Sequence, residues 1–311
     1  MRESVRSQSV SFDRRHVGIR QKDWLPYALI APAVLLVSVI VLYPAFTALR
    51  VSLFDLNLLR PSETKFIGLG NFTNLFLTDR IFWSSFLGTL RWTGCIVVVQ
   101  LALALPVALF LNVNFRWRGA LRTVVLIPWV VPVAVTSVIW VYIFDANFGV
   151  GNEILVRLGI ISAYKAWLID ATWSFVALVL GMLWTGFPFM AIILLAALQA
   201  IPPDIYEAAR IDGAGPWQSF SYITLPQLMP TILLVVLLRT MWLSNHVDLI
   251  YLLTDGGPGR TNYTMSLYSF MLTSIQFNLG YASAVAVVLA GMLLVAAIVY
   301  TRQIEKIREY M

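Results

Sequence analysis

Long runs of apolar residues without a single charge dominate this sequence and limit what it can fold into. Residues 24–49 contain no charged side chain, and neither do residues 92–115. An α-helix needs about 20 such residues to cross the hydrocarbon core of a bilayer. Charged residues make up 12% of the chain, whereas a soluble domain has roughly a quarter. The sequence therefore predicts an all-α integral membrane protein.

Six apolar runs separated by polar connections predict six transmembrane helices within one membrane domain, residues 24–301. The expected spans cover residues 26–49, 92–114, 121–144, 175–200, 227–252 and 282–301. Polar segments 1–23 and 302–311 flank the domain. The apolar run that follows residue 23 is too long for the core of a signal peptide, so we expect an uncleaved first span.

The distribution of lysine and arginine predicts which side of the membrane each end occupies. With the N-terminus in the cytosol, 13 of the 22 basic residues flank the spans on the inside, 8 lie outside, and Arg239 lies within the fifth span. This asymmetry follows the positive-inside rule. Both termini are therefore expected in the cytosol. The net charge of +6 is then explained without a nucleic-acid partner.

The connection between the fourth and fifth spans, residues 201–226, contains "IPPDIYEAARIDGAGPW". Asp204 stands where an N-cap is expected, three residues before Glu207, which is the spacing of a capping box. Gly213 permits a left-handed C-terminal cap. These signals predict a helix of about two turns, which is not stable alone. It is either a surface helix that closes a loop or a docking helix for a cytosolic partner.

The residues of this connection resemble a known family. The pattern matches the EAA signature of permease subunits of binding-protein-dependent ATP-binding cassette (ABC) importers. The matching positions are Glu207, Ala208, Ala209, Gly213, Ile223, Leu225 and Pro226. Residues 184–214, the segment "LIYLLTDGGPGRTN" and "FIGLGNF" are similar to the sugar-uptake branch, the maltose and glycerol-phosphate type. The resemblance extends over nearly the whole chain from about residue 24.

The resemblance implies the type I ABC importer fold, in which this chain would form part of the membrane pathway and separate subunits would hydrolyse ATP. The cytoplasmic helix between spans 4 and 5 would couple the permease to an ATPase subunit dimer, through Glu207, Ala208, Ala209, Arg210, Asp212 and Gly213. ATP and Mg would bind to that dimer, and the chain itself contains no Walker-type phosphate loop. We therefore expect no catalytic residue, no metal and no cofactor in this chain.

The family also implies further partners and a location. These are a second, homologous permease subunit, a periplasmic or lipid-anchored sugar-binding protein, and the surrounding membrane lipid. The chain would lie in the bacterial cytoplasmic (inner) membrane and import a sugar or sugar derivative by alternating access.

Polar and aromatic side chains within the fourth and fifth spans are candidates for the substrate path, because intramembrane polar groups are rare unless they face a cavity or a partner. Arg239, Trp242 and His246 are expected on one helical face. The candidates for translocation are Trp184, Phe187, Trp242, Asn245, His246 and Asp248. For Arg239 and Asp248 a structural or interfacial role is the favoured alternative.

Two other classes of transporter are compatible with six spans. An ion-coupled secondary transporter would suit the polar fifth span, but the sequence has no inverted repeat and the helix at residues 201–226 would have no use. An ABC importer of a non-sugar solute is the nearer alternative, because it would retain the EAA signature.

Overall fold

The computed structural model describes residues 25–309, so the predicted segment 1–23 lies outside the described residues. In the described range, five helices are long and apolar enough to cross a membrane. A sixth span is present if the bent pair α5 (Arg118–Val130) and α6 (Val133–Ile143) is counted as one. The prediction of an all-α membrane protein is confirmed.

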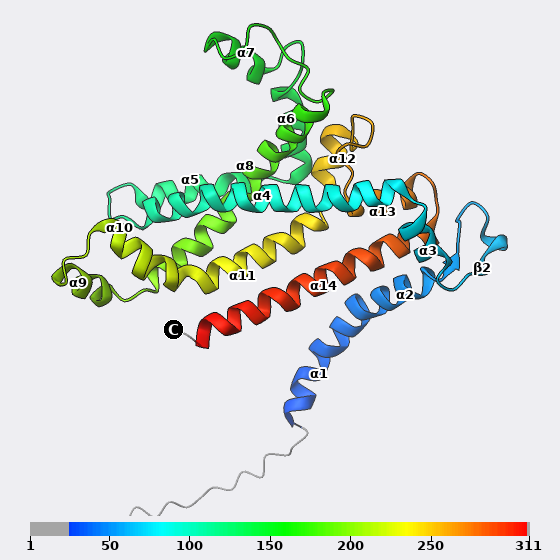
Figure 1. The fold of residues 1–311 in the computed structure, drawn as a ribbon, viewed down its shortest axis with the longest axis horizontal. Coiled ribbons are helices and arrows are strands. Elements are labelled where there is room, and N and C mark those ends of the chain that lie inside the picture. The colour runs from blue at the N-terminus through cyan, green and yellow to red at the C-terminus, as the bar shows by residue number, and fades with distance from the viewer. Residues whose placement is uncertain (1–24, 310–311) are drawn as a thin grey trace, which may run out of the picture. The chain divides into compact units, whose positions relative to one another are not determined.

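Helices account for most of the secondary structure (Figure 1). Besides α5 and α6, the α-helices are α1 (Leu25–Val37), α2 (Tyr43–Val51), α3 (Gly70–Leu77), α4 (Arg80–Asn112), α7 (Val150–Arg157), α8 (Ala171–Gln199), α9 (Pro203–Ile211), α10 (Pro216–Ser219), α11 (Leu225–Ser244), α12 (Asp248–Thr254), α13 (Met265–Ser274) and α14 (Leu279–Glu309). Two π-helical segments, η1 (Ser38–Leu42) and η3 (Phe220–Thr224), and one 3₁₀ turn, η2 (Pro61–Glu63), join them. The strands β1 (Phe54–Asp55) and β2 (Lys65–Phe66) form a short antiparallel hairpin.

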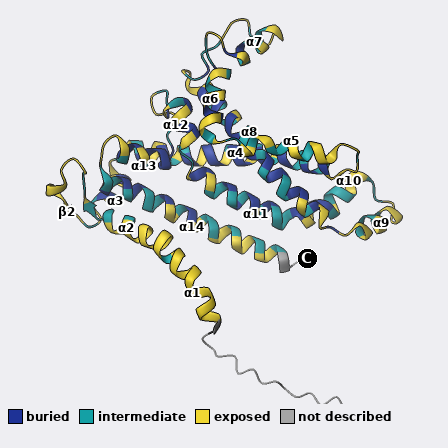
Figure 2. Ribbon diagram, turned by 180° about the vertical axis from the view of Figure 1, so that it is seen from behind, coloured by how far each residue is buried: buried dark blue, intermediate teal, exposed yellow. Residues whose placement is uncertain are grey.

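The chain divides into two compact units, residues 1–47 and 48–311, and each is described by itself. In the first unit, α1 continues through η1 into the start of α2, and the residues from Pro26 onward form apolar helix. The described side chains of this stretch are almost all exposed (Figure 2). A helix that is hydrophobic on all sides is typical of a membrane span.

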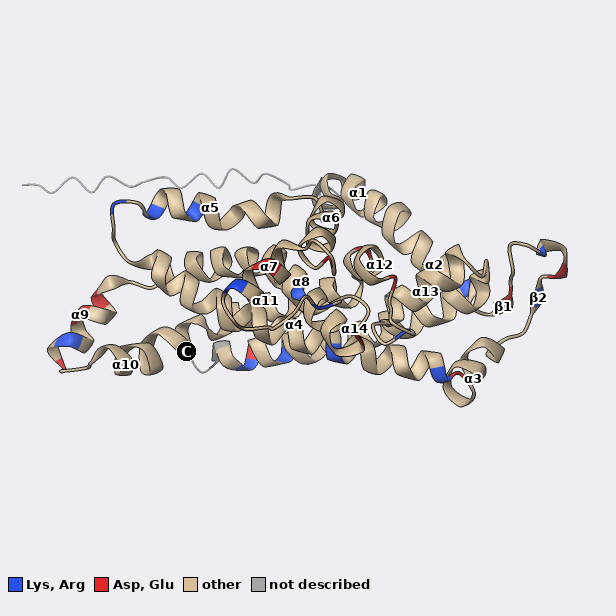
Figure 3. Ribbon diagram, turned by 90° about the horizontal axis from the view of Figure 1, so that it is seen from above, with Lys and Arg blue, Asp and Glu red and all other residues tan. Residues whose placement is uncertain are grey.

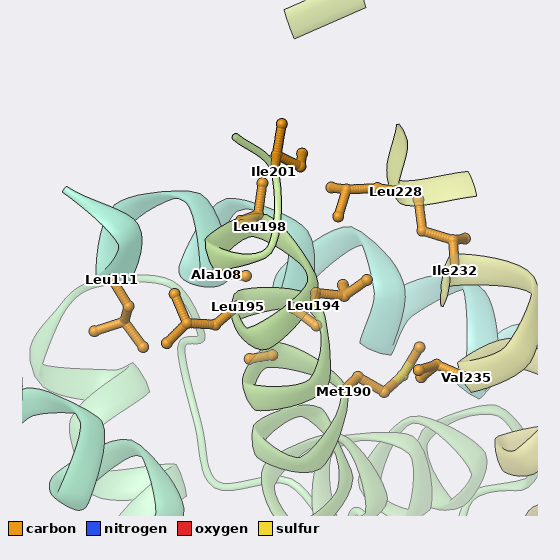
Figure 4. Packing of buried hydrophobic residues seen from close by; sticks show 12 residues of the cluster. Ala108, Leu111, Met190, Leu194, Leu195, Leu198, Ile201, Leu228, Ile232 and Val235 are labelled. Atoms are coloured by element: carbon orange, nitrogen blue, oxygen red, sulfur yellow. The ribbon is translucent and has the colours of Figure 1, made fainter. Parts of the chain in front are cut away.

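In the second unit the long helices form a bundle, in which α4 packs along α8, and α11 contacts both α4 and α14 (Figure 1). Its largest apolar cluster joins α4, α8 and α11 (Figure 4). Ala104, Ala108 and Ala191 are fully buried there. Small residues let helix backbones approach closely, which is the usual basis of helix association within membranes.

The third predicted span, residues 121–144, was expected to be one helix, and this expectation is wrong. α5 ends at Val130, α6 begins at Val133, and their axes differ by 91°. Val131 and Pro132 between them have extended backbone conformations. Proline lacks a backbone N–H and disfavours helical geometry in the residue before it. Pro132 therefore explains both the end of α5 and the sharp bend.

The fifth predicted span, residues 227–252, is also interrupted. α11 ends at Ser244, and α12 begins only at Asp248. The backbone carbonyl of Leu243, within the last turn of α11, accepts a hydrogen bond from the indole nitrogen of Trp92 on α4, 3.1 Å away. It also accepts one from the backbone N–H of His246, 3.2 Å away. These bonds replace the helical pattern, so the residues from Asn245 onward leave the axis of α11.

Two further helices extend beyond their expected bounds. α4 begins at Arg80 rather than near residue 92, because Asp79 caps its first turn by accepting hydrogen bonds from two backbone N–H groups. α14 does not end near residue 301 but continues to Glu309. The charged residues close to these helix ends are thus incorporated into helices rather than into loops.

Candidate functional site

The helix α9 occupies the connection between α8 and α11, where a short helix was predicted. It begins at Pro203, directly after the N-cap residue Pro202, and no side chain caps it. The prediction that Asp204 is the N-cap is therefore wrong. Proline is favourable in the first turn of a helix, because its fixed φ suits the helix and its missing N–H needs no partner there.

The predicted C-terminal cap of α9 is confirmed. Asp212 follows the last helical residue, and Gly213 has a φ of +81°. The backbone N–H of Ala214 then donates to the carbonyl of Ala209 at 2.9 Å. Left-handed backbone of this kind costs glycine little and strains most other residues. Gly213 therefore lets the chain leave α9 with this left-handed conformation.

One side of α9 is attached to the bundle and the other is free. The hydroxyl of Tyr206 is 3.0 Å from the hydroxyl of Thr224 in η3, and the Tyr206 ring packs against the apolar cluster of α4, α8 and α11. Glu207 and Ala208 lie on other faces of the helix and are exposed, whereas Ala209 is half-buried and Arg210 is an exposed residue one turn after Tyr206. Charged residues of both signs mark this helix in Figure 3.

Large apolar side chains are exposed at the end of α9 and in the segments α10 and η3 that follow it. Ile211 is 87% exposed, Trp217 is 76% exposed and Tyr222 is 80% exposed. Exposed apolar surface of this kind is found where another protein or the lipid covers it.

A second feature is a cavity of about 340 Å³ at the break between α5 and α6. α8 and α11 form its other walls. Its lining residues are Trp129, Val131, Val133, Met182, Thr185, Gly186, Arg239, Trp242, Leu243 and His246. The helix break at Pro132 and the end of α11 therefore lie next to the same cavity.

Two of the six residues predicted for the substrate path line this cavity, Trp242 and His246. His246 lies beyond the end of α11, so it reaches the cavity from a non-helical segment rather than from the predicted helical face. Asn245 lines a different cavity, between α11 and α14. Asp248 is exposed at the start of α12.

The other two predicted residues belong to α8 but do not line the cavity. Trp184 meets the ring of Trp140 edge-on, with their centroids 6.5 Å apart. Phe187 is half-buried. Their neighbour Gly186 lies at the cavity instead. α8 continues unbroken through Gly186 and Pro188.

Arg239 occupies the most polar part of the cavity wall. It is 6% exposed, and its Nε donates to the side-chain oxygen of Gln100, 2.9 Å away on α4. The Gln100 amide nitrogen in turn donates to the backbone carbonyl of Met182 on α8 at 2.7 Å. A methyl group at Gly186 would overlap the side-chain nitrogens of both Gln100 and Arg239. Glycine at this position is what admits the guanidinium.

Aromatic rings form another part of the wall, and the ring of Trp242 lies next to the guanidinium of Arg239. Trp129 stacks on Phe189 with centroids 5.7 Å apart, and Phe189 lies 4.9 Å from the ring of Trp242. The Nε2 atom of His246 is buried and has no hydrogen-bond partner among the described residues. The site thus combines flat apolar surfaces with unused polar groups.

Sequence reasoning missed Trp129, Thr185 and Gln100. No pattern within one helix would have found them, because they come from three different helices. The signal for Gln100 was its position as an amide in an otherwise apolar run.

Comparison with known proteins identifies the family. Residues 100–309 match the model of the binding-protein-dependent transport system inner membrane component. The sulfoquinovosyl glycerol transport system permease protein SmoG of Agrobacterium fabrum is 37% identical, over 89% of each chain. The trehalose/maltose transport system permease protein MalF of Thermococcus litoralis is 36% identical, over 89% of this chain and 92% of its own length.

A solved structure shares the fold. A chain of a bacterial alginate ABC transporter, crystallised with an alginate pentasaccharide-bound periplasmic protein, superimposes with a TM-score of 0.77. It is 24% identical, over 92% of this chain and 95% of its own. The chain described here belongs to the binding-protein-dependent inner membrane component family. The predicted ABC importer permease class and the inner-membrane location are confirmed.

Proposed function

We propose that this permease translocates a sugar or sugar derivative from a periplasmic binding protein into the cytoplasm, driven by a separate ATPase dimer. The relatives named for sulfoquinovosyl glycerol, trehalose/maltose and trehalose support the sugar class. A second, homologous permease completes the membrane part of the complex, and both termini of this chain face the cytosol. ATP and Mg bind to the ATPase subunits, and this chain needs no cofactor of its own.

The single observation that carries the coupling role is the two-sided attachment of α9. Tyr206 attaches one side to the bundle, while Glu207 and Ala208 are exposed on other faces of the helix. Alanine allows a partner surface to approach closely, and the charged residues offer charge-assisted hydrogen bonds to it. Ile211, 87% exposed, adds apolar surface that docking would bury.

The order of the helices along the chain supports the idea that a movement of α9 is passed on to the substrate path. α9 follows α8 after a short turn, and η3 leads from α10 directly into α11. The same two helices carry Gly186 and Arg239 to the cavity. Movement of α9 by a closing ATPase dimer would therefore move two walls of the cavity. Alternating access requires such a rigid connection between the site of energy input and the site of transport.

The cavity supports the passage of a sugar. Trp129 and Trp242 present indole rings for stacking against the C–H face of a sugar ring, and Thr185 and His246 offer hydrogen-bonding groups. Its volume of about 340 Å³ lies within the range of small-molecule sites.

The test is reconstitution. The tagged full chain is purified gently with its co-purifying proteins, and the complex is placed in proteoliposomes together with its binding protein. We expect an ATPase subunit and a second permease to co-purify, and sugar uptake to require ATP. Uptake by the chain alone, driven by a proton or sodium gradient, would favour the secondary transporter. ATP-driven uptake of a non-sugar solute would contradict the sugar class.

A further inference from the structure

Arg239 is a buried cation that faces a cavity without an anion beside it. Its side chain is 6% exposed. Among the described side chains no carboxylate lies within 4.0 Å of its guanidinium. The ion pairs that the described residues form are Arg60–Glu63 and Arg157–Glu153. α11 is one of the candidate membrane spans. Charged groups within a membrane are costly and normally pair with an opposite charge or face an aqueous cavity.

The protein satisfies only part of the hydrogen-bonding capacity of Arg239. A guanidinium carries five N–H donors in a planar fork. The Nε–H group donates to Gln100, and one terminal nitrogen lies 3.9 Å from the sulfur of Met182, which is a weak acceptor. Because Arg239 lines the cavity, its terminal N–H groups are available to a guest molecule. That fork matches the two oxygens of a carboxylate, sulfonate or phosphate.

The rest of the cavity wall supplies no opposite charge; its one favourable contact with the guanidinium is the ring of Trp242, whose centroid lies 5.9 Å from the central guanidinium carbon. No lining residue is acidic, and the one other titratable group is His246. Apart from the hydroxyl of Thr185, the remaining walls are apolar or aromatic, including Trp129 and Trp242. In surroundings of low polarity the attraction between the guanidinium and an anion is much stronger than in water.

The guanidinium is also held in place before any guest arrives. Gln100 bridges Arg239 to the backbone of α8 through bonds of 2.9 Å and 2.7 Å. Gly186 leaves the space that the two side chains fill. A donor that is already ordered loses little conformational freedom when its ligand binds.

We propose that this cavity selects an anionic sugar, whose carboxylate, sulfonate or phosphate group binds the guanidinium of Arg239 while the sugar ring lies against Trp129 and Trp242. This inference rests on the proposed function, because it takes the cavity as part of the substrate path. It assigns to Arg239 the role of a specificity-determining residue.

The first experiment identifies the charge of the cargo. Proteoliposomes that hold the complete importer receive ATP and an external mixture of glucose, maltose, trehalose, glucuronate, glucose 6-phosphate and 6-deoxy-6-sulfoglucose, and mass spectrometry identifies the sugars inside. We expect an anionic sugar to accumulate in preference to the neutral ones. Which of the three anionic sugars accumulates shows whether the bound group is a carboxylate, a phosphate or a sulfonate. Preferential accumulation of a neutral sugar would overturn the anionic class and leave the sugar importer intact. Accumulation of no sugar would overturn both proposals.

The second experiment tests Arg239 itself. Arg239→Gln should lower uptake of the anionic sugar at least about tenfold, in line with the loss of a charge-assisted bond, and Arg239→Lys should lose less. Arg302→Gln removes the same charge from an exposed position of α14 and should retain normal uptake. Normal uptake by Arg239→Gln would contradict the proposal. Co-purification of the partner subunits checks that each variant still assembles.

A second variant tests Arg239 without replacing it, so that the proposal can still be tested if Arg239→Gln does not fold. Thr185 lines the same cavity, so Thr185→Asp introduces a carboxylate that pairs with Arg239 and competes with the substrate. Thr185→Asn is its neutral match. We expect Thr185→Asp to lower uptake of the anionic sugar about tenfold further than Thr185→Asn. Equal effects of the two variants would overturn the role of Arg239.

Discussion

At the scale of single residues, Asp79 joins three helices through one carboxylate. Its Oδ1 accepts hydrogen bonds from the backbone N–H groups of Ile81 and Phe82 and so caps α4. Its Oδ2 accepts hydrogen bonds from the hydroxyl of Tyr268 on α13 at 2.7 Å and from the hydroxyl of Tyr281 on α14 at 2.8 Å. Burial, followed by the hydrogen bond to Asp79, raises the pKa of Tyr268 above its ordinary value.

The first prediction concerns this carboxylate. Asp79→Ala removes the cap and both tyrosine contacts, and it should lower the free energy of unfolding by about 2 kcal/mol. Asp79→Asn keeps an oxygen for the cap and should lose clearly less. Thermal unfolding of the purified proteins in detergent measures both changes. The interpretation would be wrong if Asp79→Ala unfolded at the same temperature as the unchanged protein.

At the scale of elements, the apolar runs predicted the long helices but not where they break. The bend between α5 and α6 has a local cause, Pro132, which is visible in the sequence. The end of α11 has a distant cause, the indole of Trp92 on another helix, which hydrogen-bonds to Leu243. A periodicity within one segment carries no information about such a contact. For this reason His246 does not share a helical face with Arg239 and Trp242, although all three residues line the same cavity.

The candidate site, like the fold, could be predicted from sequence only where its signals are local. The helix α9 could be placed because its signals are local, namely Gly213 and the EAA residues. The cavity could be predicted only in part: Trp242 and His246 were candidates, but Trp129, which also lines it, and Gln100, which holds Arg239, come from helices that the spacing around Arg239 does not describe. Residues that act alone on one element can be found from sequence, whereas those gathered from several elements require the fold.

The second prediction concerns the C-terminal cap of α9. A β-branched residue at the φ of +81° adopted by Gly213 costs on the order of 1–3 kcal/mol. Gly213→Val should therefore unwind the end of α9 and lower the ATPase stimulation by substrate-loaded binding protein several-fold. Asparagine tolerates left-handed backbone, so Gly213→Asn should retain more of the stimulation. Equal stimulation in the Val variant and the unchanged protein would contradict this requirement.

At the scale of the whole molecule, the account depends on α9 as the link between ATPase and cavity. Glu207 is exposed on its free side. Glu207→Ala should leave the protein inserted in the membrane but lower the recovered ATPase subunit about tenfold, because a charge-assisted hydrogen bond is lost. Glu305→Ala changes an exposed glutamate on α14 and serves as the control. Normal recovery and normal transport with Glu207→Ala would remove this residue from the docking surface.

The most direct test of the central claim is cross-linking from α9. Cys95 is the single cysteine, so a Cys95→Ser protein provides the background for one new cysteine. Ala208→Cys, at an exposed position of α9, is labelled with a photoreactive maleimide in the assembled complex, and Ser62→Cys, exposed beside the β1–β2 hairpin, is the control. The account predicts an adduct between residue 208 and the ATPase subunit, and none from residue 62. An assembled, active complex without that adduct would contradict it.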